Sequence, residues 1–204
     1  MQPFYVLVPG LSTEEAPFRA VDVRDFVSAH TDLPALAWRI MLSNVDETSA
    51  NGSPRSVVAG GIRFIFPGDD RRIDAAGRIR RYPAGTFDLI CSDARSPELD
   101  PLEIVKLLKP GGIAFYGNWA ALAPGKRQLE LPDIKARIAG TDAQVEPLVG
   151  PWPLRHPLER SEHLAYYGYG GDDDDRIEEL AVRASLSKFV IRRLAGGFRD
   201  RAGR

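Results

Sequence analysis

Short, largely apolar runs that end in glycine, proline or aspartate constrain the fold of this chain most strongly. Residues 4–8, 62–66, 87–92 and 113–116 are runs of this kind. A strand that is apolar at successive positions is typical of a sheet with both faces covered. Stretches of helical character separate several of these runs. The sequence therefore predicts an α/β fold with a mainly parallel sheet.

The intervening stretches complete the expected order of elements. Gly60-Gly61 lies between two β-rich runs and fits the two-residue turn of a hairpin. Residues 44–55 and 147–157 are rich in turn-forming residues and are predicted to be loops. Further strands are expected at 21–23, 164–169 and 188–194, and helices at 27–42, 102–108, 131–139 and 176–182, with a short helix starting near residue 12.

Length and charge limit the classes of function. The 204 residues allow one domain, expected at 1–195, followed by a flexible Gly- and Arg-rich tail at 196–204. Lys and Arg total 27 and Asp and Glu total 28, and this balance argues against a nucleic-acid partner. No apolar run reaches the length of about 20 residues that a membrane-spanning helix requires. The first residues lack the features of a signal peptide, so we expect a cytoplasmic protein.

The most specific pattern lies between residues 87 and 119. FDLICSD at 87–93 is followed, after a helical stretch, by LLKPGG at 107–112 and a further strand. This resembles the fourth strand, following helix and fifth strand of class I S-adenosylmethionine-dependent methyltransferases. The resemblance implies a Rossmann-like, doubly wound sheet with helices on both faces. It also implies S-adenosylmethionine as cofactor.

The resemblance assigns roles to residues that follow the strands. Pro9 and Gly10 stand where the family has a glycine-rich cofactor loop, although this chain has fewer glycines there. Asp22 is the candidate for the acidic residue after the second strand, and Asp69 for the aspartate on the adenine side. Asp93, after the fourth strand, is a candidate for both cofactor binding and catalysis. The remaining catalytic candidate is Asn118, which follows the fifth strand.

The acceptor and the metal remain open at this level. The Asp93-Ala94 pair is similar to that of metal-dependent, catechol-type O-methyltransferases, which implies O-methylation of a small molecule. Position 117 holds glycine where that group has a second aspartate, and this loss of a ligand argues against a bound Mg²⁺. The alternative is a methyltransferase-like subunit that has lost catalysis and has a structural or regulatory binding role. Either interpretation leaves room for a homo-oligomer or a protein partner.

Overall fold

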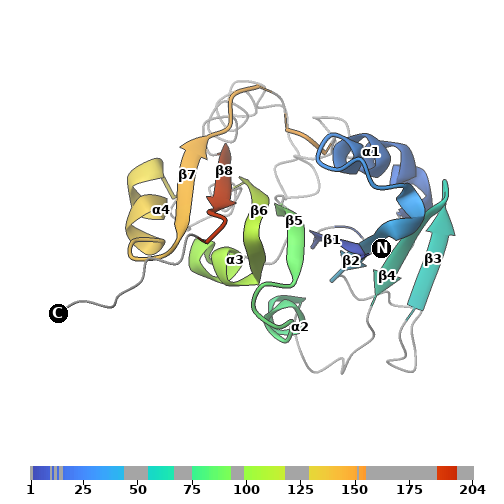
Figure 1. Cartoon of the computed structure of the whole chain (residues 1–204), viewed down its shortest axis with the longest axis horizontal. Coiled ribbons are helices and arrows are strands. Elements are labelled where there is room, and N and C mark those ends of the chain that lie inside the picture. Colours follow the sequence, from blue (N-terminus) through green and yellow to red (C-terminus); the bar gives the residue numbers. More distant parts are fainter. Residues whose placement is uncertain are drawn as a thin grey trace, which may run out of the picture.

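The computed structural model describes residues 2–9, 11, 13, 16–43, 55–66, 75–92, 99–117, 129–150, 152–154 and 188–196. They form an α/β fold around one mixed sheet of eight strands (Figure 1). The strands are β1 (Phe4–Val8), β2 (Trp38–Leu42), β3 (Arg55–Ala59), β4 (Ile62–Phe66), β5 (Phe87–Ser92), β6 (Leu108–Gly117), β7 (Ala143–Pro147) and β8 (Lys188–Arg193). The helices are α1 (Ala16–Ser28), α2 (Ala75–Arg80), α3 (Pro101–Leu107) and α4 (Leu131–Arg137), with a 3-10 turn η1 at Ala35–Ala37.

The central strands of the sheet pair in parallel, and the pairings towards its two ends are antiparallel. The strand order is β3-β4-β2-β1-β5-β6-β8-β7. Strands β4, β2, β1, β5 and β6 run in the same direction. At one end β3 pairs antiparallel with β4, and at the other β8 lies antiparallel between β6 and β7. The prediction of an α/β fold with a parallel centre is confirmed, and the whole sheet is mixed.

Two hydrophobic clusters cover the two faces of the sheet. Successive residues of β1 alternate between them, because Val6 and Val8 belong to the first cluster and Leu7 to the second. The first cluster contains the buried face of α1, including Val23 and Phe26. The second contains buried residues of α2, α3 and α4. This arrangement explains the continuous apolar runs, since each central strand needs an apolar side chain on both faces.

The N-terminal third differs from the prediction. Residues 21–23 lie in helix α1, and residues 38–42 form β2 rather than the end of a helix. In α1, Ala16, Ala20, Val23 and Val27 are buried at helical spacing, whereas Val21 is exposed. In β2 the buried and half-buried residues alternate, as in a strand. The helical spacing from Leu33 to Met41 was therefore coincidental, and Leu36 is 75% exposed.

The two glycine turns are built differently. Gly60 and Gly61 join β3 to β4 with φ values of 55° and 77°, as a two-residue hairpin turn of the I′ type requires. The Pro-Gly-Gly sequence does not separate α3 from the next strand, because α3 ends at Leu107 and β6 begins at Leu108. Instead, residues 109–112 bulge from β6 opposite the single residue Asp88 of β5.

Several expectations lie partly or wholly beyond the described part of the chain. The predicted strand at 164–169, the helix at 176–182, the start of a helix near residue 12 and nearly all of the tail fall there. Strand β8 confirms the prediction at 188–194, whereas β7 and α2 were not predicted. None of the helices described is long and apolar enough to cross a membrane.

Candidate functional site

The order of the strands reverses direction beside β1. The chain passes from β1 to β2 and β4 on one side, and then to β5 and β6 on the other. In open parallel sheets, ligands bind outside the carboxyl ends of the strands at such a reversal. We call the line of strand ends from β4 to β6 the carboxyl edge, and the opposite line the amino edge. The carboxyl ends of β1 and β5 are therefore the first place to look for a site.

A buried polar cluster joins the carboxyl ends of β1 and β2. The Ser43 hydroxyl, directly after β2, donates a hydrogen bond to the carbonyl oxygen of Pro9, directly after β1. Arg78 of α2 donates from Nε and Nη2 to the carbonyl oxygen of Ser43, at 3.1 Å each. Ser43 and Arg78 are both buried. The cluster fixes where the first two strands end, and it places a guanidinium beside the strand reversal.

This cluster could not be predicted from the sequence. Ser43 was assigned to a position after a helix, so it was not recognised as the end of the second parallel strand. Arg78 belongs to α2, which was not predicted. Its guanidinium reaches the carboxyl edge because the neighbouring Ile79 anchors α2 in the second hydrophobic cluster.

Of the predicted site residues, two lie in the described part of the chain. Pro9 follows β1 at the carboxyl edge, and its carbonyl oxygen is already engaged by Ser43. Gly10, Asp69, Asp93 and Asn118 lie outside the described residues. The strands that lead to Asp93 and Asn118 end at Ser92 and Gly117.

Asp22 was placed wrongly, because it does not follow the second strand. It lies within α1, and its carboxylate forms an ion pair with Arg19 at 2.6 Å. Arg19 is buried, and its charge requires a partner there. The second strand ends instead at Leu42, so Asp22 is not the acidic residue that follows it.

At the far end of the carboxyl edge, Lys188 begins β8. Its register partner on β6 is Gly117, the last residue of that strand. Lys188 is half-buried, and its burial lowers the pKa of the side-chain ammonium, because desolvation disfavours the charged form. Its backbone carbonyl accepts a hydrogen bond from the Leu148 N–H at 2.8 Å.

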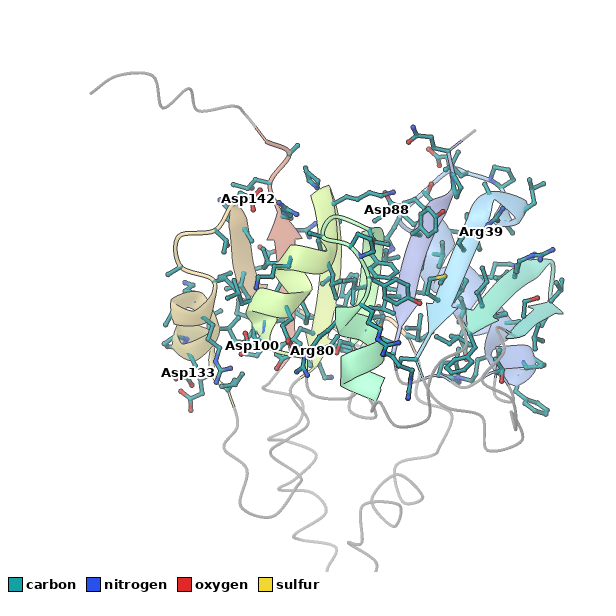
Figure 2. The ribbon with its side chains drawn as sticks, turned by 90° about the horizontal axis from the view of Figure 1, so that it is seen from below. Arg39, Arg80, Asp88, Asp100, Asp133 and Asp142 are labelled. Carbon is teal, nitrogen blue, oxygen red and sulfur yellow. The ribbon has the colours of Figure 1, made fainter. Side chains whose placement is uncertain are left out.

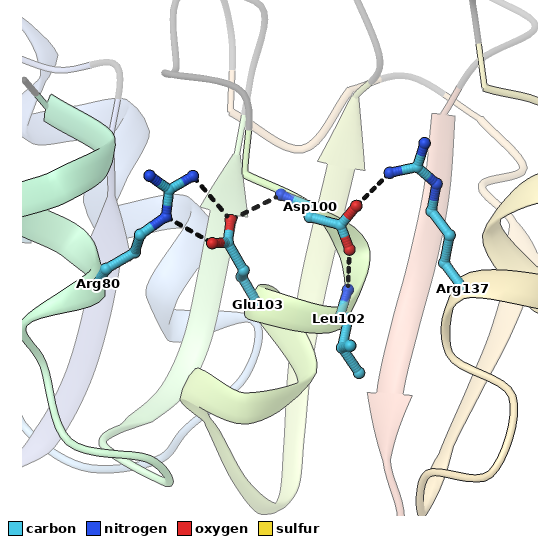
Figure 3. Close-up of polar contacts among 5 residues, drawn as sticks. All are labelled: Arg80, Asp100, Leu102, Glu103 and Arg137. Carbon is cyan, nitrogen blue, oxygen red and sulfur yellow. Dashed lines mark hydrogen bonds and ion pairs between the residues drawn. The ribbon is translucent and has the colours of Figure 1, made fainter.

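The N-terminus of α3 is held by a charged network (Figure 3). Asp100 caps the helix by accepting from the N–H of Leu102, and Glu103 accepts from the N–H of Asp100. Arg80 of α2 pairs with Glu103, and Arg137 of α4 pairs with Asp100. This capping box fixes the end of the connection that begins after β5. It ties together the three helices that cover the second face of the sheet.

Asp88, the aspartate of the FDLI sequence, lies near the amino edge of the sheet. Oδ2 of Asp88 accepts from the Tyr5 N–H at 2.8 Å and from Lys109 Nζ at 2.6 Å. Lys109 Nζ also lies 5.3 Å from the centre of the Tyr5 ring. Figure 2 shows Asp88 towards one edge of the sheet, with Asp100 and Arg80 towards the other. Asp88 is therefore distant from the carboxyl edge and links β1, β5 and the bulge of β6.

A pocket of 310 Å³ lies between α2 and α3. It is lined by Arg80, Tyr82, Ala84, Glu103, Lys106 and Leu107. None of these residues ends a strand of the sheet. Within the described ranges, no three His, Cys, Asp or Glu side chains gather in a way that could hold a metal ion.

Solved structures include proteins with a remote likeness to this chain. A SAM-dependent methyltransferase from Archaeoglobus fulgidus is 12% identical to this chain, with a TM-score of 0.39. The match covers 93% of this chain and 86% of the other. No protein-family model and no curated protein matches the sequence.

Proposed function

We propose that the chain is a Rossmann-like, doubly wound methyltransferase that uses S-adenosylmethionine to methylate a hydroxyl group of a small molecule. The observation that carries this proposal is the fold of residues 87–92 and 99–117. This stretch, which carries the resemblance, forms a strand, a helix and a parallel neighbouring strand. Its first strand, β5, lies directly beside the reversal of strand order. Asp93 and Asn118 follow these two strands in the sequence.

The described residues of the carboxyl edge are compatible with such a cofactor. Pro9, Ser92 and Gly117, which end or follow β1, β5 and β6, are small. Small residues allow a nucleoside to approach the strand ends closely, as dinucleotides do at glycine-rich turns. S-adenosylmethionine would supply an electrophilic methyl group, and we propose Pro9, Gly10, Asp69 and Asp93 as the residues that hold it. We do not include Mg²⁺, because Gly117 cannot provide a carboxylate ligand.

Cofactor binding tests the proposal directly. We expect isothermal titration calorimetry to show binding of S-adenosylhomocysteine to the wild type and at least tenfold weaker binding to Asp69→Ala. Asp25→Asn, on the exposed side of α1, is the matched control and should bind like the wild type. Absence of binding to the wild type would reject the proposed cofactor. Unchanged binding by Asp69→Ala would reject the role of Asp69 alone.

A second candidate is the catalytically inactive subunit, and one observation favours it. Phe18 and Val21 of α1 are 86% and 70% exposed, on the side of the helix that faces away from the sheet. These two side chains would form part of the surface that such a partner covers. A methyltransferase that binds cofactor and turns over a small acceptor without a second protein would exclude this alternative.

A further inference from the structure

The two terminal strands of the sheet differ in how well they are protected against further pairing. Strand β7, at one end, contains Glu146 and ends at Pro147, which has no N–H to donate. Charged residues and prolines of this kind keep an edge strand from pairing with another chain. Strand β3, at the other end, has neither a charged residue nor a proline between Ser56 and Ala59. Figure 1 shows β3 as the outermost strand at the end of the sheet near α1.

The turn of the β3–β4 hairpin decides which backbone groups of β3 point outwards. Gly60-Gly61 is a two-residue turn, so Ala59 forms a hydrogen-bonded pair with Ile62 on the other side of it. Hydrogen-bonded pairs recur at every second residue of an antiparallel ladder. The N–H and C=O groups of Ser56 and Val58 are therefore directed away from β4. Within the described ranges, no other backbone group bonds to them.

The side chains along this edge are apolar on both faces of the sheet. Val58 lies opposite Arg63 of β4 and is 63% exposed. Val57 is half-buried on the other face, the one that α1 covers, because its register partner Phe64 belongs to the first hydrophobic cluster. A strand added to this edge would thus cover one valine on each face.

Helix α1 extends this apolar surface beside the hairpin. Ala20 and Arg24 pack against the turn, since their side chains lie 3.4 Å and 3.5 Å from the position that a Cβ would take at Gly60. Val21 lies on the adjoining side of the helix and is 70% exposed. A second sheet joined to β3 would therefore meet an apolar side chain of α1 as well.

We propose that β3 pairs antiparallel with β3 of a second copy of this chain, which joins the two sheets across a twofold axis at Val57. Ser56 and Val58 stand symmetrically about Val57, so Ser56 of each copy lies opposite Val58 of the other. The N–H and C=O groups that point outwards from one copy then bond to those of the other. Neither residue is charged, so the pairing places no like charges opposite each other. The edge is complementary to itself, as a twofold interface requires.

This pairing leaves the proposed cofactor site accessible. Strands β4 and β2 separate β3 from β1, where the strand order reverses. The inference is therefore independent of the proposed methyl transfer, and either can fail without the other.

A cysteine at the axis tests the register. Opposite residues without mutual hydrogen bonds have Cα atoms about 4.5 Å apart, within reach of a disulfide. We expect Val57→Cys to form a disulfide-linked dimer on mild oxidation, because Cys91, the natural cysteine, is buried. Val58→Cys is the matched control, since diagonal neighbours lie about 7–8 Å apart, too far for a disulfide. Random collisions would instead favour Val58→Cys, because Val58 is more exposed than Val57.

A proline in the edge tests the hydrogen bonds between the copies. Val58→Pro removes an N–H that points outwards, so it should leave the hairpin intact and weaken the dimer. We expect sedimentation over a dilution series to show a wild-type dimer, and a dissociation constant about tenfold higher for Val58→Pro. Val58→Thr keeps the N–H and the branched shape and should dimerise like the wild type. Circular dichroism checks that both variants fold.

Each outcome supports or contradicts the interface. A wild type that stays monomeric at every concentration overturns the inference and leaves this edge to a strand of a different protein. A dimer that folded Val58→Pro does not weaken must use another surface, which also contradicts it. Disulfide formation by Val58→Cys in preference to Val57→Cys rejects the register. The two cysteine variants decide the question if Val58→Pro does not fold.

Discussion

At the scale of the residue, some charged side chains of this chain stabilise the fold, and others lie at the carboxyl edge. Asp22 and Asp88 both have structural partners, Arg19 and Lys109 respectively. Lys188 and Arg78 lie at the carboxyl edge, but neither was predicted from the sequence to be there. The sequence alone could not separate these groups, because an aspartate after an apolar residue looks the same whether it holds a ligand or a neighbouring strand.

Asp88 should contribute to stability rather than to ligand binding. Its carboxylate accepts hydrogen bonds from a lysine and from a backbone N–H, so Asp88→Ala should lower the free energy of unfolding by about 1–3 kcal/mol. Glu146→Ala removes a more exposed ion pair and serves as the control, with an expected loss of about 0–1 kcal/mol. Urea denaturation of both variants measures the difference. A clear loss of S-adenosylhomocysteine binding in folded Asp88→Ala would contradict this assignment.

Lys188 should impose a pH-dependent cost on folding. Its pKa is lowered in the folded protein, so below that folded value the lysine is protonated in both states and its burial disfavours the fold. The penalty disappears as the pH rises from the folded pKa through the ordinary value of 10.5. Lys188→Met should therefore raise the free energy of unfolding at pH 7, and this gain should shrink as the pH approaches 10.5.

Urea denaturation at pH 7 and at pH 10 provides the measurement. Lys135→Met is a suitable control, because Lys135 is exposed on α4. An equal effect of Lys188→Met at the two pH values would contradict the expected linkage.

At the scale of the element, the sequence predicted strands more reliably where they are buried on both faces. β1 and β5 have apolar residues on both faces and were recognised at nearly their observed bounds. β3 and β4 were recognised instead from the hairpin pattern around Gly60-Gly61, although Arg63 of β4 is exposed. β7, at the edge of the sheet, was missed, because Gln144 and Glu146 leave it little apolar character. Residues 21–23 were mistaken for a strand, because two valines favour β structure when their neighbours on the helix face are not considered.

The Lys-Pro-Gly-Gly sequence was recognised as a feature between a helix and a strand, but its conformation was predicted only in part. It makes a bulge rather than a helix end, and a Cβ atom at Gly112 would lie 2.9 Å from the Lys109 carbonyl oxygen and 3.1 Å from that of Phe87. Both neighbours are backbone atoms that cannot rotate away. Glycine is therefore required here by close packing against β5.

Gly112→Ala should consequently destabilise the fold by about 1–3 kcal/mol through overpacking. Gly196→Ala is the matched control, because nothing lies within 4 Å of the position where its Cβ would be. Thermal denaturation of the two variants compares them directly. Equal melting temperatures would show that the bulge adapts to a side chain.

At the scale of the whole molecule, the central strands are flanked by other strands on both sides, and a hydrophobic cluster covers each face. β1 lies between β2 and β5, and Val6 and Leu7 are completely buried. β3 and β7 are the terminal strands and contain exposed residues. The order of strands could not be predicted from the sequence, because local patterns do not specify which strands become neighbours.

In native-state hydrogen exchange, the amides of the central strands should exchange more slowly than those of the terminal strands. We expect the amides of β1 and β5 to exchange only through global unfolding, and those of β3 and β7 to exchange through smaller openings. NMR or mass spectrometry after transfer to deuterated water would measure the rates. If the amides of β7 proved as slow as those of β1, a partner or a second copy covering that edge would have to be considered.

The antiparallel insertion of β8 has a consequence for the time course of synthesis. β7 forms hydrogen bonds only with β8 within the sheet, so it can join β6 only through a strand that is translated much later. A nascent chain ending before residue 188 would expose the unpaired edge of β6 to other chains. The edge of β6 therefore stays open to pairing with other chains until β8 has been synthesised.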